Sequence, residues 1–378
     1  MTDAQILDKI DTEVSASARV PELTIVVPTF NERDNVFQLV ESIDQALTGV
    51  AWEIVFVDDD SPDGTADTVR TLALKDPRVR ILQRIGRRGL SSACIEGFLS
   101  SSAPNLAVMD GDLQHDETVL PQMLDKLREG STDLVVGTRY ALGGSVGEWD
   151  ASRQRMSHLA TRICKLMTGV SLSDPMSGFF MMRRDAFHSV ARDLSGIGFK
   201  ILLDIAATGK GKLRVAEVPF TFAPRHAGES KLDSMILWEF LMLLLDKKFG
   251  WFIPARFLSF AFIGAFGVVV HFLVLMSLYH LVDLAFIWAE VGAVTIAMIS
   301  NFALNNVLTY RDRRKTGWKW LIGLASFMGV CSVGAVANVG IAHYLYSGST
   351  FWALAALAGI LVGLVWNYAL TAVYTWKK

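Results

Sequence analysis

Acidic side chains follow a short apolar run within residues 106–115, and their types and spacing suit metal-assisted chemistry. The run from Leu106 to Met109 predicts a buried strand that ends on Asp110 and Asp112, with one glycine between them. Two carboxylates one residue apart at the carboxyl end of a parallel strand can both bind one hard divalent cation. Gln114 adds a neutral oxygen ligand. The alternative is a solvated turn, because Asp and Gly are common turn formers.

The apolar runs around this segment predict the sheet that would position the carboxylates. Further strands are expected at Leu23–Val27, Trp52–Val57, Val79–Leu82 and Leu134–Gly137. Helical patterns lie between them, starting near Arg33 and covering Leu90–Ser101 and Thr118–Glu129. Strands and helices that alternate at this spacing predict a parallel sheet with right-handed crossovers, and hence an α/β fold of the nucleotide-binding type. Another helix is expected to start after the second strand, with Ser61 as N-cap and Pro62 at its first position.

Three of the predicted strand ends are acidic. Glu32 follows the first strand, Asp58 to Asp60 follow the second, and Asp110 and Asp112 follow the fourth. On one edge of one sheet, these groups predict a site for a base or ribose and for a metal-bridged diphosphate. No Gly-x-Gly-x-x-Gly follows the first strand, which argues against a dinucleotide site, and no Gly-Lys-Ser/Thr phosphate loop occurs.

Composition divides the chain into a globular part and a membrane part. It is 378 residues long and 51% hydrophobic with only 20% charged residues, which is too apolar for an ordinary soluble protein. The excess lies after about Arg256. The net charge of −2 argues against a nucleic-acid binder. Three widely spaced cysteines form neither a disulfide framework nor a metal motif, which fits a reducing, cytoplasmic setting. Residues 1–20 lack the apolar segment of a signal peptide and are expected to form a mobile tail.

Several longer motifs run in order through the first part of the chain. They are Pro28–Glu32, Val57–Ser61, Asp110–His115, Gly137–Tyr140, Asp174–Phe180, Gly198–Lys200 and Arg225–Lys231. This set resembles glycosyltransferase family 2, which has the Rossmann-like GT-A fold, and within it the dolichol-phosphate mannose synthases. The resemblance covers about residues 23–231. Gly111 stands where these synthases often have Ala, and Met176 where Thr or Val is common.

The resemblance implies a role for each motif. The nucleotide sugar would contact Pro28, Glu32, Asp59, Asp110, Gln114 and Lys231, and the acceptor phosphate would contact Arg139, Arg153 and Ser157. Mn²⁺ or Mg²⁺ would be held by Asp110, Asp112 and Gln114 as a Lewis acid that stabilises the leaving diphosphate. Asp112, Arg139 and Arg225 would be the catalytic residues.

The implied acceptor, a polyprenyl phosphate, explains why no general base is evident. A phosphate monoester with a second pKa near ~6 is already largely ionised at neutral pH and needs positioning by cationic side chains instead. Asp174 is expected to orient the sugar or an arginine and not to act as a base. His115, His158 and His226 are expected to be structural.

The apolar block from Ser234 to Leu245 is about twelve residues long, too short to cross a bilayer, which takes roughly twenty. Lysines and aromatic residues follow it, so it is predicted to lie on the membrane as an interfacial helix. A buried core helix remains the alternative. The expected domains are therefore the tail at 1–20, the GT-A domain at 21–231, interfacial helices at 232–254 and a four-span domain at 255–378.

Four membrane spans are expected, at Arg256–Leu281, Ile287–Tyr310, Trp320–Tyr346 and Phe351–Trp376. Lysines and arginines gather between the second and third spans and at the C-terminus, whereas the other two connections have none. By the positive-inside rule, this multi-pass protein has its catalytic domain in the cytoplasm. The oligomeric state stays open, a homo-oligomer included.

The second and fourth spans end alike, because Asn301–Tyr310 matches Asn367–Trp376. The spans therefore read as two copies of a helical hairpin and resemble a small four-span membrane family found fused to such synthases or encoded apart from them. Asn301, Asn305 and Asn367 are expected to form interhelical hydrogen bonds or to line the axis that relates the two copies.

The predicted function is transfer of mannose from GDP-mannose to a polyprenyl phosphate by an inverting, membrane-bound glycosyltransferase. The nearest alternative uses UDP-glucose or another sugar nucleotide. A processive polysaccharide synthase is disfavoured because the chain has no Gln-x-x-Arg-Trp motif. From another class, the four spans could flip lipid-linked sugar across the membrane.

Overall fold

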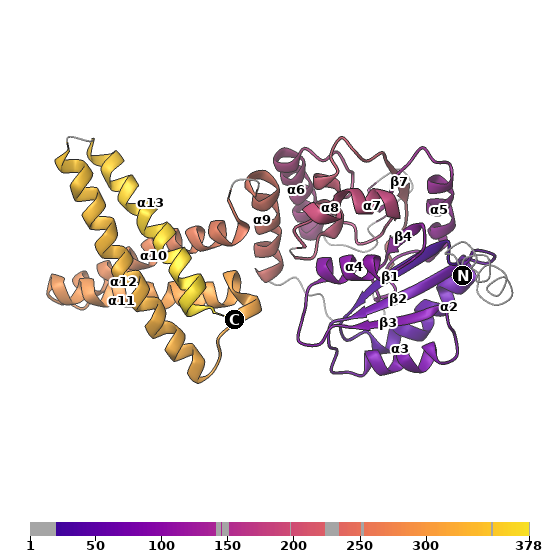
Figure 1. Cartoon of the computed structure of the whole chain (residues 1–378), viewed down its shortest axis with the longest axis horizontal. Helices are drawn as coiled ribbons and strands as arrows, with labels where there is room; N and C mark the ends of the chain where they lie inside the picture. The colour runs from indigo at the N-terminus through magenta and orange to yellow at the C-terminus, as the bar shows by residue number, and fades with distance from the viewer. Residues whose placement is uncertain are drawn as a thin grey trace, which may run out of the picture. The chain divides into compact units, whose positions relative to one another are not determined.

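The computed structural model describes residues 20–140, 145, 151–196, 198–223, 234–250, 253–348 and 351–377. The predicted mobile tail lies outside these residues, except for Val20. The chain forms two compact units, Met1–Lys248 and Phe249–Lys378, and each is described by itself (Figure 1).

A seven-stranded sheet forms the centre of the first unit, in the order β3-β2-β1-β4-β6-β5-β7. The strands are β1 Leu23–Thr29, β2 Trp52–Asp58, β3 Val79–Gln83, β4 Asn105–Val108, β5 Leu134–Thr138, β6 Phe180–Arg183 and β7 Val215–Pro219. The five expected strands are all present. The expected parallel arrangement holds for these five strands, but the sheet as a whole is mixed, because β6, which was not expected, runs antiparallel to both β4 and β5. Hydrophobic periodicity reports which residues are buried and carries no information on strand direction.

Helices cover both faces of the sheet. One face packs against α2 Val36–Ala46, α3 Thr65–Ala73 and α5 Leu120–Arg128, which contribute buried residues such as Leu39, Val69 and Met123. The other packs against α4 Leu90–Leu99, α7 Arg184–Val190 and α8 Ile201–Thr208 through residues such as Phe98 and Phe187. Short 3₁₀ turns lie at Arg33–Asn35, Glu117–Val119 and Ala191–Asp193. The sheet therefore has a hydrophobic core on each of its two faces.

The predicted start of α3 was wrong. The helix begins at Thr65, and Gly64, with a φ of 89°, precedes it as the N-cap residue. Asp63 accepts hydrogen bonds from the Thr65 backbone nitrogen at 2.9 Å and from its hydroxyl at 2.6 Å. Ser61 donates instead to Asp58 at the end of β2, at 2.5 Å. The Ser61 hydroxyl, which was predicted to cap α3, therefore bonds the Asp58 carboxylate at the end of β2 instead.

Helix α9, Ser234–Phe249, packs on one side against the other helices of the first unit. Leu243 and Leu244 join a buried cluster with Cys164 of α6, Ala151–Thr168, and Leu203 of α8. Lys247 pairs with the fully buried Asp204 at 2.5 Å. The core-helix alternative therefore describes this side, while Leu237 and Phe249 stay exposed.

The second unit contains four helices that are long and apolar enough to cross a membrane, as far as the described residues show. They are α10 Ala255–His280, α11 Phe286–Leu304, α12 Trp318–Ser347 and α13 Trp352–Leu370, with π-helical turns at Asn305–Thr309 and Thr371–Thr375 and a 3₁₀ turn at Arg311–Arg313. Helix α10 pairs with α11, and α12 pairs with α13 (Figure 1). The expected spans agree with the observed helices, π-helical turns included, to within two residues at either end.

Equivalent contacts recur in the two hairpins. Ser259 bonds Thr309 at 2.6 Å in the first, and Ser326 bonds Thr375 at 3.0 Å in the second. The π-helical turns end on Tyr310 and Trp376, whose rings stack with centroids 4.1 Å apart and 6° between their planes.

The expected role of the asparagines needs correction. The Asn305 amide donates to the Asn301 carbonyl of its own helix, so this bond is not interhelical. Added Cβ atoms at Gly267 and Gly334 would lie 2.3 and 2.1 Å from the side-chain oxygens of Asn301 and Asn367. These asparagines therefore meet a neighbouring helix at a glycine, where backbone and side chain approach closely.

Candidate active site

The acidic strand ends meet at one edge of the sheet. Strand β1 lies between β2 and β4, and both neighbours run parallel to it. Because parallel strands end at the same edge, the residues after β1, β2 and β4 come together there. Thr29 stands opposite Asp58 in the register, and the Asp59 nitrogen donates to the Thr29 carbonyl at 3.0 Å. The edge therefore collects the three acidic segments that the sequence placed at strand ends.

A histidine holds the loop that carries the predicted metal ligands. The Asp110 backbone nitrogen donates to His115 Nδ1 at 3.1 Å, and His115 Nε2 lies 3.6 Å from Asp110 Oδ2. The buried His115 ring stacks on Phe179, with centroids 5.1 Å apart. Removal from water raises the pKa of the Asp110 carboxyl; His115 opposes this shift and the Asp112 charge adds to it.

Gln114 is anchored so that its amide oxygen stays available. Its Nε2 donates to the Ala223 carbonyl at 3.0 Å, and the Ala223 nitrogen donates to the Gln114 carbonyl at 2.9 Å. Asp112 is buried and accepts from the Gln114 backbone nitrogen at 3.3 Å. No cluster of three His, Cys, Asp or Glu side chains suited to a metal occurs within the described residues. The predicted donor set would be two carboxylates and one amide oxygen, which are hard ligands of the type that Mg²⁺ or Mn²⁺ prefers.

Gly178 and Gly111 lie close to this loop and differ in how well each position could accommodate a Cβ atom. A Cβ at Gly178 would lie 2.8 Å from Asp110 Oδ2, so only glycine lets this segment approach the carboxylate. A Cβ at Gly111 would lie 3.3 Å from Val27 Cγ1 and 3.4 Å from Thr29 Cγ2. Small shifts would relieve those contacts, so the fold can accept the alanine that related synthases often have at this position.

Arg139 is held by Asp174 in a two-point ion pair. Arg139 Nε lies 2.7 Å from Asp174 Oδ2, and Nη2 lies 2.9 Å from Oδ1. The side chains are 10% and 1% exposed, respectively. Asp174 therefore orients an arginine, one of its two expected roles.

Asp59 is held by groups that lie 25 and 30 residues further along the chain. Its Oδ2 accepts from the Gly89 nitrogen at 2.7 Å, and its Oδ1 lies 3.0 Å from Nη1 of the buried Arg84. Arg84 also donates to the Gly89 carbonyl at 3.0 Å. Burial raises the pKa of the Asp59 carboxyl, against the opposing effects of Gly89 and Arg84. Nearby, Glu32 accepts from the Asn35 amide at 2.8 Å, and Pro28 lies on β1.

Comparison with known proteins identifies both units. Residues 24–190 match the family described as Glycosyl transferase family 2, and residues 259–376 match GtrA/DPMS, transmembrane domain. Dolichol-phosphate mannosyltransferase of Pyrococcus furiosus is 35% identical over 370 residues, which cover 94% of this chain and 99% of that protein. The chain belongs to the dolichol-phosphate mannosyltransferase family. It is therefore a glycosyltransferase with a membrane domain, and the expected GT-A type of fold is confirmed.

Other relatives carry related names. Dolichol-phosphate mannosyltransferase of Saccharomyces cerevisiae is 34% identical, covering 69% of this chain and 98% of that protein. Undecaprenyl-phosphate mannosyltransferase of Micrococcus luteus is 34% identical, covering 57% and 88%. Among solved structures, glucosyl-3-phosphoglycerate synthase from Mycobacterium tuberculosis with Mn²⁺, UDP and glucosyl-3-phosphoglycerate is 16% identical with a TM-score of 0.46, covering 64% of this chain and 84% of that one.

The sequence alone predicted no role for Lys200, although this residue lies close to the candidate site. Lys200 donates to the Met176 carbonyl at 3.4 Å and lies within electrostatic range of Asp110, Asp174 and Arg139. Burial lowers the pKa of its ammonium group, and the Arg139 charge adds to this effect. The motif Gly198–Lys200 was the available signal, but nothing local related it to Asp110.

Four expected site residues are not described in full. Arg225 and Lys231 lie outside the described residues, as does His226. Arg153 and Ser157 lie on α6, but the description does not extend to their side chains, nor to that of His158. Their assignment to the acceptor phosphate and the diphosphate stays a prediction.

Proposed function

We propose that this protein transfers mannose from GDP-mannose to a polyprenyl phosphate at the cytoplasmic face of a membrane, with inversion at the sugar carbon. The observation that carries the proposal is the two-point pair of Arg139 and Asp174 in a segment that also approaches the Asp110 carboxylate at Gly178. An arginine held in one orientation, next to carboxylates that could bind a metal ion, suits a transfer reaction between two substrates that both carry phosphate. The relatives' names, with dolichol, undecaprenyl or polyprenol phosphate, support the acceptor class.

Mn²⁺ or Mg²⁺ would be held by Asp110, Asp112 and Gln114, whose oxygens suit either ion. When bound, the ion supplies Lewis-acid stabilisation of the charge on the diphosphate leaving group. Mg²⁺ sites of this kind use one or two carboxylates together with substrate phosphates, so a small protein donor set is sufficient. The His115 and Ala223 contacts keep the loop oriented before the substrate arrives.

The acceptor needs orientation more than activation. Its phosphate oxygen is largely ionised at neutral pH, since the second pKa lies near ~6. Arg139 carries a planar donor set suited to phosphate, and Asp174 fixes that plane. We assign Arg153 and Ser157 to the same phosphate, and Arg225 and Lys231 to the diphosphate side, on the resemblance of their motifs.

The nucleotide would bind at the β1 and β2 ends. We assign Asp59, whose carboxylate is fixed by Gly89 and Arg84, to the nucleotide on the resemblance of its motif, and Glu32 and Pro28 border the same edge. A carboxylate that accepts from ring N–H groups can bind guanine as well as uracil, so the choice between GDP-mannose and UDP-glucose is the point that the experiment must decide.

The orientation in the membrane follows from charge. The connection between α11 and α12 contains Arg311, Arg313, Arg314 and Lys315, with Lys319 in the first turn of α12. Positively charged connections usually stay in the cytoplasm, and two spans, α10 and α11, separate this connection from the first unit, which supports a cytoplasmic position for the first unit as well.

The test uses purified full-length protein with radiolabelled GDP-mannose or UDP-glucose, polyprenyl phosphate and Mn²⁺. We expect an organic-extractable mannosyl lipid with GDP-mannose, and its loss with EDTA. A glucosyl lipid from UDP-glucose alone would replace the donor assignment. No lipid-linked sugar from either donor would contradict the proposal as a whole.

A further inference from the structure

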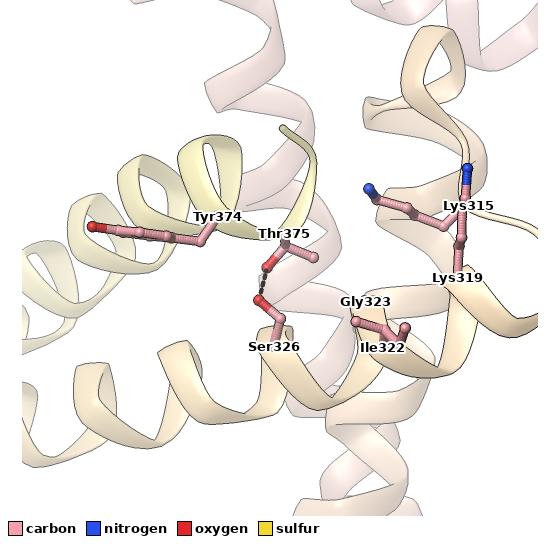
Figure 2. Close-up of a pocket in the computed structure, with 7 residues that line it drawn as sticks. All are labelled: Lys315, Lys319, Ile322, Gly323, Ser326, Tyr374 and Thr375. Carbon is pink, nitrogen blue, oxygen red and sulfur yellow. Dashed lines mark hydrogen bonds between the residues drawn. The ribbon is translucent and has the colours of Figure 1, made fainter. Parts of the chain in front are cut away.

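A hollow of about 120 Å³ lies in the second membrane hairpin, at the end that carries the basic connection. Figure 2 shows Lys315 and Lys319 on one side of it and the joined hydroxyls of Ser326 and Thr375 on the other. Its volume corresponds to about four water molecules at ~30 Å³ each. It is therefore large enough for a small polar group and too small for a sugar nucleotide.

The charge of this hollow is positive. Neither Asp nor Glu lines it, and Lys315 and Lys319 form no ion pair within the described part of the chain. Two ammonium groups in one hollow repel each other, and an anion bound between them removes that repulsion. The favoured occupant is an anion with several acceptor oxygens.

A buried side chain fixes the position of Lys315. Asn306 Oδ1 accepts from the Lys315 backbone nitrogen at 2.8 Å, and Asn306 Nδ2 donates to the Lys315 carbonyl at 3.0 Å. The same Oδ1 accepts from Trp376 Nε1 at 3.2 Å. The backbone of Lys315 is thus tied to the ends of both hairpins, so this lysine extends from a fixed backbone position.

The far side of the hollow supplies a hydrogen-bond donor. Ser326 and Thr375 share one hydrogen bond at 3.0 Å. Each hydroxyl has one donor, so one donor of the pair remains for an oxygen of a bound group. Lysine ammonium groups and hydroxyl donors together are a recurring set for phosphate.

The outer wall is apolar. Ile322 is exposed in the structure, and Tyr374 is 67% exposed. Both belong to segments that cross the membrane, so their exposed surfaces face lipid. An occupant that combines an anionic head with a hydrocarbon chain would contact both surfaces.

The first hairpin provides an internal comparison. It has the same hydroxyl pair, Ser259 and Thr309, at 2.6 Å. Three residues before its serine stands Arg256, whereas the second hairpin has Gly323 at the same spacing from Ser326. A Cβ at Gly323 would lie 3.0 Å from Phe302 Cζ and 3.5 Å from Lys315 Cγ. The glycine therefore lets Phe302 and the Lys315 side chain pack closely against the wall of the hollow, where the first hairpin has a long cationic side chain.

We propose that this hollow binds the phosphate group of a membrane lipid, as a monoester or diester. Lys315 and Lys319 neutralise the phosphate, Ser326 or Thr375 donates a hydrogen bond, and the lipid chain follows Ile322 and Tyr374 into the membrane. The site is built from the membrane unit alone, and the proposal does not depend on the transfer reaction.

The experiment uses full-length protein in detergent micelles with a photoactivatable phosphatidic acid, followed by mass spectrometric mapping of the labelled peptides. We expect labelling within residues 315–326 or 371–376, and none there from a diacylglycerol that carries the same photoreactive chain. Mapping separates this site from any lipid bound to the first unit. Equal labelling by the neutral analogue would overturn the proposal.

Two variants and a matched control sharpen the test. Lys315→Gln with Lys319→Gln should raise the lipid concentration for half-maximal labelling about thirtyfold, the scale for removing two charges near a membrane surface. The Asn306 contacts use the Lys315 backbone and survive the change. Arg314→Gln removes a charge from the same connection but not from the hollow, and should leave labelling unchanged. Equal labelling of the double variant and the wild type would contradict the proposal.

A second variant, Ser326→Ala, keeps the proposal testable if the double lysine variant fails to fold. Competition with inorganic phosphate distinguishes a lipid phosphate from free phosphate as the occupant. Ser326→Ala removes one hydroxyl and should weaken labelling several-fold. Inorganic phosphate at the concentration of the lipid should not compete, because it lacks the hydrocarbon chain. If it displaces the lipid at equal concentration, the occupant is free phosphate and the lipid assignment is wrong.

Discussion

Arg139 and Asp174 lie 35 positions apart in the sequence and meet through two hydrogen bonds of 2.7 and 2.9 Å. Asp174 is fully buried, so its charge depends on Arg139 for compensation. Breaking such a buried pair costs about 3–5 kcal/mol, because one charge is left without its partner. The pair thus links the stability of this segment to the orientation of a phosphate-binding guanidinium.

Asp174→Asn should therefore impair both stability and acceptor use. We expect a lower melting temperature and a KM for polyprenyl phosphate raised about tenfold or more, with a smaller change for the sugar nucleotide. Steady-state kinetics with each substrate varied in turn measure the difference. Asp133→Asn is the control, since its pair with the exposed Arg214 should contribute little. An unchanged acceptor KM would contradict the positioning role.

Asp112→Ala should remove metal-dependent transfer. We expect a fall of about 10²–10³-fold, the scale for losing one electrostatic contribution to the transition state. Gln114→Ala should keep more activity but require more Mn²⁺, because one neutral ligand is lost. Rates measured over a Mn²⁺ titration test both. Wild-type rates for Asp112→Ala would refute the assignment of the metal site.

The two glycines beside the acidic loop should respond differently to the same methyl group. In Gly178→Ala the new Cβ would lie 2.8 Å from Asp110 Oδ2 and displace the carboxylate. We expect metal affinity about tenfold to hundredfold weaker. Gly111→Ala is the matched variant, since its contacts of 3.3 and 3.4 Å need only small shifts. Calorimetric titration with Mn²⁺ compares them, and equal affinities would show that the close approach has no effect on the site.

Lys200→Met should separate activity from stability. Burial lowers the pKa of Lys200, so the folded protein holds this charge at a cost. We expect an unchanged or higher melting temperature together with a transfer rate about tenfold to hundredfold lower, because the positive charge beside Asp110 and Arg139 is lost from the candidate site. Lys200→Arg keeps the charge and should retain more activity than Met. Full activity of the Met variant would assign the lysine a structural role only.

Local patterns in the sequence determined five of the seven strands, the acidic strand ends and the four apolar helices, whereas β6 and β7 were not expected. Each depends on neighbours within one element: Leu106 to Met109 are buried together, and Asp110 and Asp112 follow directly. Apolar length and the distribution of lysine and arginine are equally local properties, which is why the span limits agree closely with the helices.

Tertiary structure decided the rest. The direction of β6, the pairing of Arg139 with Asp174, the position of Lys200 and the capture of Ser61 by Asp58 all depend on how the chain folds back on itself. The lipid-phosphate hollow likewise needs Asn306 and Thr375 beside the basic segment. Such contacts follow from packing and long-range hydrogen bonds, and periodicity within a single element does not encode them.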